Sequence, residues 1–209
     1  APRSNTGDGL RLGESVGALV DGGLAAPCAW APVSLVPRRD GSFGHFPHLA
    51  ERAKPGLIAV TADGRRFVNE ANSYYDYIDA LLKVVRPGAE PVSWLVCDHR
   101  FQRRYGLGFA KPAPLPLAPY LASGYLKRGK TLAELARACG IDSDGLVATV
   151  ERYNAAAAQG RDPEFHRGET PYNRMGGDAT VKPNPSVAPI EQGPFYAVQL
   201  HRFGGSAIA

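Results

Sequence analysis

The chain has 209 residues, of which 44% are hydrophobic and 21% are charged, and its net charge is +4. This length fits one domain with a real core, and the composition excludes a chain that is disordered throughout. The mild basic excess argues against a nucleic-acid-binding protein, and no apolar run reaches the roughly 20 residues of a membrane span.

The three cysteines, Cys28, Cys97 and Cys139, form no Cys-x-x-Cys pair. Their odd number and wide spacing argue against a zinc site or a disulfide framework. We therefore expect a reducing compartment, a cytoplasmic protein and no metal site. The chain begins at Ala1 without a methionine, which favours an excised segment of a longer protein.

The first half of the chain predicts short helices and strands in alternation. A turn at 5–9 opens a helix whose apolar residues recur at helical spacing as far as Val20. Residues 24–54 are rich in Pro, Gly and Ala and predict an irregular linker, with one strand at Val33–Val36. The further elements are a hairpin of 57–60 and 66–68, a helix at 73–85, a strand at 92–97 and a short helix at 100–105.

The second half predicts a pair of helices, a long polar segment and a final strand. Thr131 and Glu134 form a capping box before a helix that ends at Gly140, and a second helix follows at 143–158. Residues 161–192 are too many for a routine connection and predict a packed or functional segment. With a strand at 195–200, these elements indicate an α+β fold with a small mixed or antiparallel sheet, several helices and long loops.

Tyr74 is the main candidate for chemistry. It lies at the expected start of a helix, where free backbone amides favour a phenolate, and Glu70 could orient it or pass protons. The alternative is structural, with Tyr74, Tyr75 and Tyr77 in an aromatic core cluster and Glu70 capping a helix. The residues alone favour this structural interpretation. No Gly-x-Gly-x-x-Gly loop lies between a strand and a helix, so the sequence shows no dinucleotide fold of its own.

Other polar residues are weaker candidates for a site. Tyr172 and Arg174 lie in the long polar segment and could line one, although their spacing is not specific. His45 and His48 are three residues apart without further ligands nearby, so we expect ordinary loop histidines. Five arginines could anchor a carboxylate by bidentate contacts, although solvation is the simpler interpretation for most of them: Arg65, Arg66, Arg100, Arg103 and Arg104.

Several segments, in their order and spacing, resemble the FAD-dependent fumarate reductase and 3-ketosteroid dehydrogenase family. They are Asn-Thr-Gly-Asp-Gly at 5–9, Gly-Arg-Arg-Phe-Val-Asn-Glu at 64–70, the strand at 94–98, Val-Glu-Arg-Tyr-Asn at 150–154, Pro-Asn-Pro at 183–185 and Gly-Pro-Phe-Tyr-Ala-Val at 193–198. In that family a substrate-binding cap domain interrupts a flavin domain. The resemblance therefore implies FAD as the cofactor, bound mainly by segments outside this chain.

The resemblance also implies a division of the chain and a set of site residues. Residues 1–23 would be the tail of the first half of the flavin domain, 24–54 a linker, 55–192 the cap domain and 193–209 a return strand. The site residues that the resemblance implies are Tyr74 and Glu70 for catalysis and Thr6, Gly7, Asp8 and Gly9 for the cofactor. For the substrate, we expect contacts from Arg100, Tyr172 and Arg174, the polar candidates named above.

The residue four positions after the motif glutamate, Tyr74, resembles the tyrosine base of the ketosteroid dehydrogenase branch, although Ser73 replaces the usual proline. The implied reaction removes two hydrogens from adjacent carbons beside a carbonyl or carboxylate. The alternatives are a fumarate-reductase-like enzyme acting on a small dicarboxylate and a stand-alone binding domain without catalysis. The expected partners are a small-molecule substrate and the remainder of the flavin domain. Without that remainder, we expect the fragment to be inactive and its exposed apolar face to allow self-association.

Overall fold

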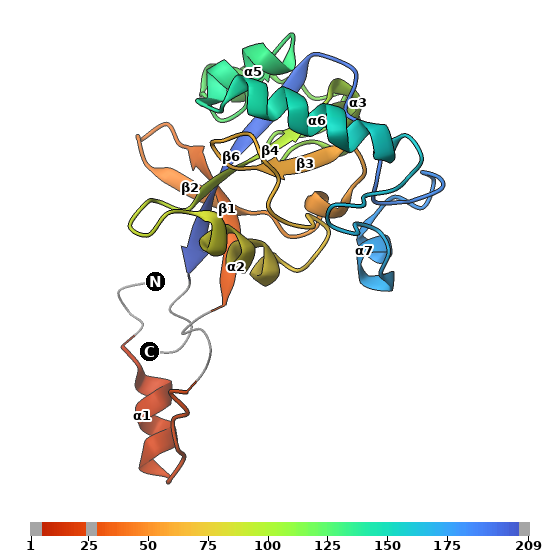
Figure 1. Ribbon diagram of the computed structural model, residues 1–209. Helices are drawn as coiled ribbons and strands as arrows, with labels where there is room; N and C mark the ends of the chain where they lie inside the picture. The colour runs from red at the N-terminus through yellow and green to blue at the C-terminus, as the bar shows by residue number, and fades with distance from the viewer. Residues whose placement is uncertain (1–5, 24–28, 205–209) are drawn as a thin grey trace.

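The computed structural model describes residues 6–23 and 29–204, and their strands form one antiparallel sheet (Figure 1). The strand order is β2-β1-β6-β4-β3, and β5 pairs with another part of β6. The strands are β1 (Trp30–Pro37), β2 (Phe43–Pro47), β3 (Leu57–Val60), β4 (Val92–Cys97), β5 (Lys127–Gly129) and β6 (Phe195–Gly204).

The described residues also form seven α-helices and one short 3-10 helix, η1 (Glu51–Ala53). The α-helices are α1 (Asp8–Ser15), α2 (Tyr74–Val84), α3 (His99–Tyr105), α4 (Ala118–Ala122), α5 (Leu132–Cys139), α6 (Ser143–Ala157) and α7 (Pro171–Gly176). The structure thus confirms the predicted α+β class, and the sheet is antiparallel rather than mixed.

Both faces of the sheet are covered, which explains why its central strands are continuously apolar. Leu57 and Ala59 of β3 pack in one core cluster with α2, whereas Ile58 and Val60 pack in a second cluster with α5 and α6. Alternate residues of a strand point to opposite faces, so one four-residue strand serves both cores. All four of these side chains are fully buried.

Residues 29–54 are more regular than the predicted linker, although the predicted strand at Val33–Val36 lies within β1. They contain β1, β2 and η1, and β1 pairs with both β2 and β6. The prolines misled the prediction because Pro32 and Pro37 lie within β1 and Pro47 ends β2. The predicted hairpin is reduced to β3 and a single bridge between Val60 and Arg66, so 66–68 is not a strand.

The helix pair agrees with the sequence analysis. The amide of Glu134 donates to Thr131 Oγ1 at 3.1 Å, and the amide of Lys130 donates to Glu134 Oε2 at 2.8 Å. The glutamate therefore reaches one residue further back than in the standard capping box. Gly140 caps α5 in the left-handed conformation at φ 70°.

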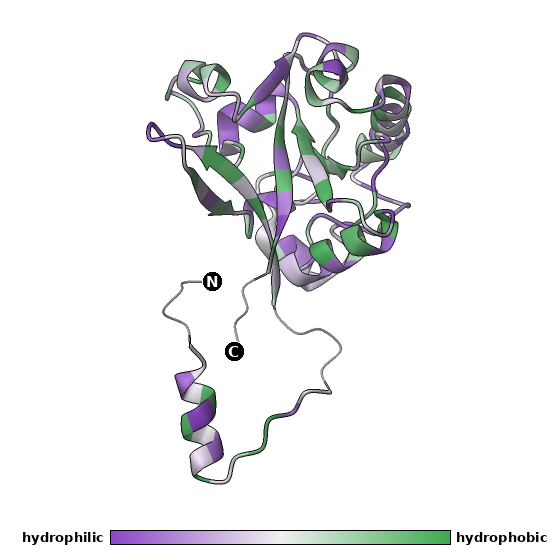
Figure 2. Cartoon of the chain, turned by 90° about the vertical axis from the view of Figure 1, so that its left-hand side faces the viewer, coloured by the Kyte–Doolittle hydropathy of each residue, from purple (hydrophilic) through white to green (hydrophobic). Residues whose placement is uncertain are grey.

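The helix α1 lies apart from the body in both views (Figures 1 and 2). None of its residues is buried, and Leu12, Val16 and Leu19 are exposed. The helix ends at Ser15, earlier than the sequence predicted, because Gly17 takes a positive φ of 86°. Of the described chain, this segment contributes least to the core.

Candidate functional site

Tyr74 is the first residue of α2, as the sequence predicts, and 41% of it is exposed. The hydroxyl of Ser73 caps the helix by accepting a hydrogen bond from the amide of Asp76 at 3.1 Å. Tyr77, three residues further along α2, is fully buried and shares a 2.9 Å hydrogen bond with Ser93. The tyrosines therefore separate into Tyr77 in the core and Tyr74 at the surface, where it can meet a ligand.

Glu70 is fully buried, and its carboxylate is held by two arginines rather than by Tyr74. Arg66 donates to both carboxylate oxygens, at 2.9 and 2.8 Å, and Arg167 donates to Oε2 at 3.1 Å. The amide of Ala59 donates to Oε1 at 2.9 Å. These four bonds use the lone pairs of the carboxylate and fix the turn that precedes Tyr74.

Asp162 completes this buried charge cluster. It accepts two 2.8 Å hydrogen bonds from Arg66, whose guanidinium also lies over the rings of Tyr153 and Phe165 at 5.0 and 4.7 Å. Burial alone would raise the pKa of Glu70, but Arg66 and Arg167 outweigh it and hold the pKa of that carboxyl below its ordinary value. Both acids are therefore ionised and form a fixed scaffold.

Arg52 also belongs to this scaffold, and the sequence analysis did not predict its role. It is 1% exposed and donates to the carbonyls of His48 at 2.8 Å, Glu70 at 2.7 Å and Asn72 at 3.2 Å. Its guanidinium lies 5.0 Å from the centre of the Tyr77 ring. The side chain thus ties η1 to the turn before α2, and a lone arginine in a polar segment gives no sequence signal for this.

A chain of amides connects the same turn to α7. Asn69 Nδ2 donates to Asn173 Oδ1 at 2.9 Å, and Asn173 Nδ2 donates to Asn72 Oδ1 at 3.0 Å. This contact brings Tyr172 beside the turn. A cavity of about 180 Å³ lies between η1, the turn and α7, and it is lined by Leu49, Ala50, Ala53, Glu70, Ala71, Asn72, Tyr172, Met175 and Gly176.

The structure brings only some of the predicted site residues together. Glu70 and Tyr172 line this cavity, and Tyr74 follows its lining residue Asn72 by two positions. Arg100 lines a different cavity and pairs with Asp98 at 3.0 Å. Arg174 donates to the carbonyl of Gly168 at 3.3 Å and does not line the cavity of Tyr172.

The predicted cofactor residues, Thr6, Gly7, Asp8 and Gly9, lie at the amino end of α1, which is separate from the body that carries α2 (Figure 1). Gly7 is the N-cap, and Thr6 Oγ1 donates to Asp8 Oδ2 at 2.8 Å. Free amides at a helix start can bind a phosphate, but this turn is open to solvent and is not enclosed by other described segments. The described part of the chain therefore does not by itself enclose a dinucleotide.

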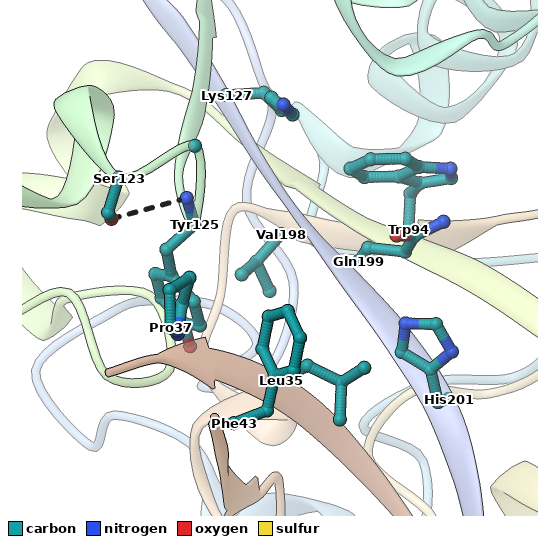
Figure 3. A pocket seen from close by; sticks show the side chains of 11 residues that line it. Leu35, Pro37, Phe43, Trp94, Ser123, Tyr125, Lys127, Val198, Gln199 and His201 are labelled. Carbon is teal, nitrogen blue, oxygen red and sulfur yellow. Dashed lines mark hydrogen bonds between the residues drawn. The ribbon is translucent and has the colours of Figure 1, made fainter. Parts of the chain in front are cut away.

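The largest of the described cavities, about 370 Å³, lies elsewhere on the sheet (Figure 3). It occupies a gap beside β6, which pairs with β5 up to Ala197 and with β1 only from His201. Trp94 and Phe43 line it together with Lys127. None of the predicted site residues lies here, so the sequence and this cavity point to different places.

Residues 6–23 and 29–204 contain neither a candidate metal-binding group nor a helix that could cross a membrane. Within these ranges His, Cys, Asp and Glu form no group of three that could hold a metal ion. Within the same residues no helix has the length and apolar character needed to cross a bilayer.

Comparison with known proteins assigns the family. The family described as FAD binding domain matches residues 1–203. The chain is 40% identical over 194 residues to 4-oxocyclohex-2-ene-1-carboxylate 5-dehydrogenase of Sinomonas cyclohexanicum, a match that covers 93% of this chain and 33% of that protein. It is 36% identical over 203 residues to 3-oxosteroid 1-dehydrogenase of Mycolicibacterium smegmatis, covering 94% and 34%.

A solved structure supports the same assignment. The 3-ketosteroid delta1-dehydrogenase of Sterolibacterium denitrificans, in complex with 1,4-androstadiene-3,17-dione, superposes with a TM-score of 0.80 at 35% identity. The match covers 96% of this chain and 35% of that one, so the chain spans about a third of its relatives' length. The chain belongs to the FAD binding domain family, and FAD is the cofactor of that family.

Proposed function

We propose that this chain is the substrate-binding cap portion of an FAD-dependent dehydrogenase that acts on a CH–CH bond beside a ketone. The names of its relatives support a cyclic ketone as substrate, since they act on an oxocyclohexene carboxylate and on 3-oxosteroids. The rest of the flavin domain would be its partner and would hold most of the FAD.

The arrangement of the chain ends supports a cap inserted into another domain. Trp30, at the start of β1, pairs with Gly204, at the end of β6, so the chain enters and leaves the body at one point (Figure 1). An inserted domain needs neighbouring entry and exit points. We therefore place the cap from β1 to β6, with 6–23 on the side of the flavin domain.

The observation that carries the proposal is Tyr74, an exposed phenol on a rigidly held helix start. Hydrogens on a carbon beside a ketone are acidic, and Tyr74 as phenolate would take one as a proton. FAD, when bound, supplies the acceptor for the second hydrogen as hydride. The scaffold of Arg52, Arg66 and Arg167 would keep the tyrosine in place without contacting the substrate.

The distribution of arginines favours a ketone over a small dicarboxylate. A dicarboxylate substrate would need arginines that converge on the site. The buried Arg52, Arg66 and Arg167 are engaged by backbone carbonyls or by the carboxylates of the cluster, and no arginine or lysine lines the cavity at Tyr172. Leu49, Tyr172 and Met175 instead give this surface an apolar character.

Substitution of Tyr74 by Phe in the FAD-loaded enzyme tests the proposal. Tyr75→Phe is the matched control, because Tyr75 is the neighbouring residue on the same helix. Under anaerobic conditions a cyclic 3-ketone should bleach the flavin absorbance, and Tyr74→Phe should slow this by about 10²- to 10⁴-fold, the usual contribution of a general base. Flavin binding should be unchanged in both variants.

Three results would contradict parts of this proposal. Equal bleaching rates in both variants would remove Tyr74 from the mechanism. Reduction by a dicarboxylate but not by the ketone would favour the fumarate-reductase-like alternative, and a protein that binds the ketone without any flavin reduction would favour a non-catalytic binding domain.

A further inference from the structure

A buried row of hydrogen bonds connects β1, the end of β2 and the turn at Phe109. The amide of Phe109 donates to Tyr125 Oη at 2.7 Å, and Tyr125 Oη lies 2.8 Å from Ser34 Oγ. Ser34 Oγ lies 2.7 Å from His48 Nε2, and His48 Nδ1 lies 2.5 Å from Glu51 Oε1. Nothing in the mechanism proposed for Tyr74 uses these groups.

The order of serine, histidine and glutamate resembles a hydrolytic triad, but the serine cannot meet a substrate. Ser34 is 1% exposed and His48 is fully buried. Tyr125 also occupies the position where the substrate of such a serine would have to lie, 2.8 Å from its hydroxyl oxygen. The row therefore holds protein segments together rather than attacking a ligand.

Only one donor-to-acceptor order along the row gives each hydroxyl hydrogen an acceptor. Tyr125 Oη accepts from the amide of Phe109, so its own hydrogen goes to Ser34. Ser34 then donates to His48 Nε2, which leaves the ring hydrogen on Nδ1, facing Glu51. His48 Nδ1 and Glu51 Oε1 make no hydrogen bond to any other group of the described structure, and they face each other only as a close N···O contact. In the opposite direction the Tyr125 hydrogen would lose its acceptor, and Nδ1 would face a carboxylate without a hydrogen.

The two ends of the row carry exposed apolar side chains. Phe109, 40% exposed, lies in a tight turn and packs against Phe46 with ring centres 6.2 Å apart. Leu49, 51% exposed, lies between His48 and Glu51 and lines the cavity at Tyr172. Segment 46–53 therefore joins the Phe109 turn to the surface near Tyr74.

The turn fits closely onto the row. Gly108 has a φ of +59°, and a Cβ at this position would lie 2.6 Å from His48 Cε1 and would also overlap Tyr125 Oη. A contact this short forces a displacement, since real Cβ atoms do not approach so closely. The backbone of the Phe109 turn therefore packs directly against His48 and Tyr125.

We propose that Tyr125, Ser34, His48 and Glu51 are positioning residues that fix the Leu49–Ala53 segment, which lines the cavity at Tyr172, against the Phe109 turn. This inference rests on the proposed function for its kinetic consequence, because only that function makes the surface a substrate site. The one-way row itself is a property of the chain and is testable without catalysis.

Nitrogen NMR of His48 tests the direction of the row at mildly alkaline pH. The expected result is a neutral ring with hydrogen on Nδ1 and none on Nε2. Tyr125→Phe should shift both the His48 nitrogens and the amide of Phe109, because it removes the two hydrogen bonds of Tyr125 Oη, one with Phe109 and one with Ser34. The matched control is Tyr120→Phe. Tyr120 packs 6.0 Å from Phe109 and 6.4 Å from Tyr125 between ring centres but is outside the row. An Nε2–H tautomer, or equal effects of the two variants, would overturn the proposal.

Kinetics of the FAD-loaded enzyme test the positioning role. Tyr125→Phe and Ser34→Ala each remove two bonds of the row and should raise KM for the ketone by about 3- to 10-fold, a change on the order of one neutral hydrogen bond, with little change in kcat. Tyr120→Phe should change neither. A loss of kcat at constant KM would overturn the positioning role. If the enzyme does not oxidise the ketone at all, the proposed function fails, whereas the NMR result still decides whether the row exists.

Discussion

Glu70→Gln gives a quantitative test of the buried charge cluster. The substitution keeps the shape of the side chain and an oxygen that can still accept from Ala59 and from Arg66 Nε, both now at 2.9 Å. It places an NH₂ group where Oε2 receives Arg66 Nη2 at 2.8 Å and Arg167 Nη1 at 3.1 Å. Two charge-assisted bonds are thereby replaced by contacts between donors.

The expected loss of stability follows from these two bonds. Hydrogen bonds to charged groups contribute about 1.5–3 kcal/mol each, and breaking a buried ion pair from one side costs about 3–5 kcal/mol. We therefore expect Glu70→Gln to lower the free energy of unfolding by about 3–5 kcal/mol. For a chain of this size each kcal/mol corresponds to about 2–4 °C in Tm, so Tm should fall by roughly 6–20 °C.

Urea titration followed by circular dichroism measures this change, with Glu164→Gln as the matched control. Glu164 belongs to the rim of the same cluster, 3.7 Å from Arg66 and 3.9 Å from Arg152, but its side chain is 38% exposed. Exposed pairs contribute about 0–1 kcal/mol, so the control should remain close to wild type. A Glu70→Gln protein within 1 kcal/mol of wild type would refute the reasoning.

The pH dependence of the free energy of unfolding gives an independent test of the ionisation of Glu70. The pKa of Glu70 is depressed below its ordinary 4.5 in the folded protein. Its ionisation therefore stabilises the fold at pH values above 4.5, and this contribution is lost as the pH falls toward the folded-state pKa. The gap in stability between wild type and Glu70→Gln should narrow below pH 4.5, and a gap that widens there would contradict the assignment.

Three further predictions concern the stability of the fold and the accessibility of its residues. Gly64→Ala should lower stability by about 1–3 kcal/mol, because a Cβ there meets the backbone at the start of α6; Gly88→Ala, also at positive φ but in open space, measures the backbone strain alone in the same denaturation assay. Burial raises the pKa of the Cys97 thiol and raises that of Cys139 to about 12, so mass spectrometry should find both unmodified by iodoacetamide at pH 8 until the protein is unfolded, and rapid labelling of the native protein would contradict this. Arg52→Met removes three carbonyl contacts and should accelerate hydrogen exchange in the turn before α2 far more than in α6; uniform acceleration would instead indicate global destabilisation.

Local patterns predicted five of the seven described α-helices, whereas α4 and α7 were not predicted. The apolar faces and the capping residue Thr131 located α5 and α6, and the strand β4 begins and ends where its composition predicted. These elements are determined by neighbours in the sequence. Only the middle of β1 was predicted, as the strand at Val33–Val36, and β2 was missed. Both strands are stabilised by long-range pairing, since β1 pairs with β2 and with β6, more than 150 residues away for the Val33–His201 pair.

In the candidate site, too, the local sequence predicts some features and does not reveal others. Tyr74 at a helix start follows from local sequence, and its exposure is compatible with the proposed chemistry. The role of Glu70 does not follow, because its partner Arg167 lies 97 positions along the chain. A sequence shows that a carboxylate follows a motif, but it does not show that two arginines, one of them distant in the chain, surround that carboxylate.

The placement of the arginines has a consequence for substrate recognition. Arg52, Arg66 and Arg167 are buried, and their donors are engaged by backbone carbonyls for Arg52, by fixed carboxylates for Arg66 and by both for Arg167, so none of them is free to bind a substrate carboxylate. A cap that still had to bind a carboxylate of the substrate would need a further cation beside Tyr172, where the described lining offers none. If the enzyme accepts an oxocyclohexane carboxylate, the carboxylate must therefore be bound from outside this cavity. Equal KM values for the carboxylate and for its neutral methyl ester, unaffected by Tyr172→Phe, would show that the cap contributes shape rather than charge.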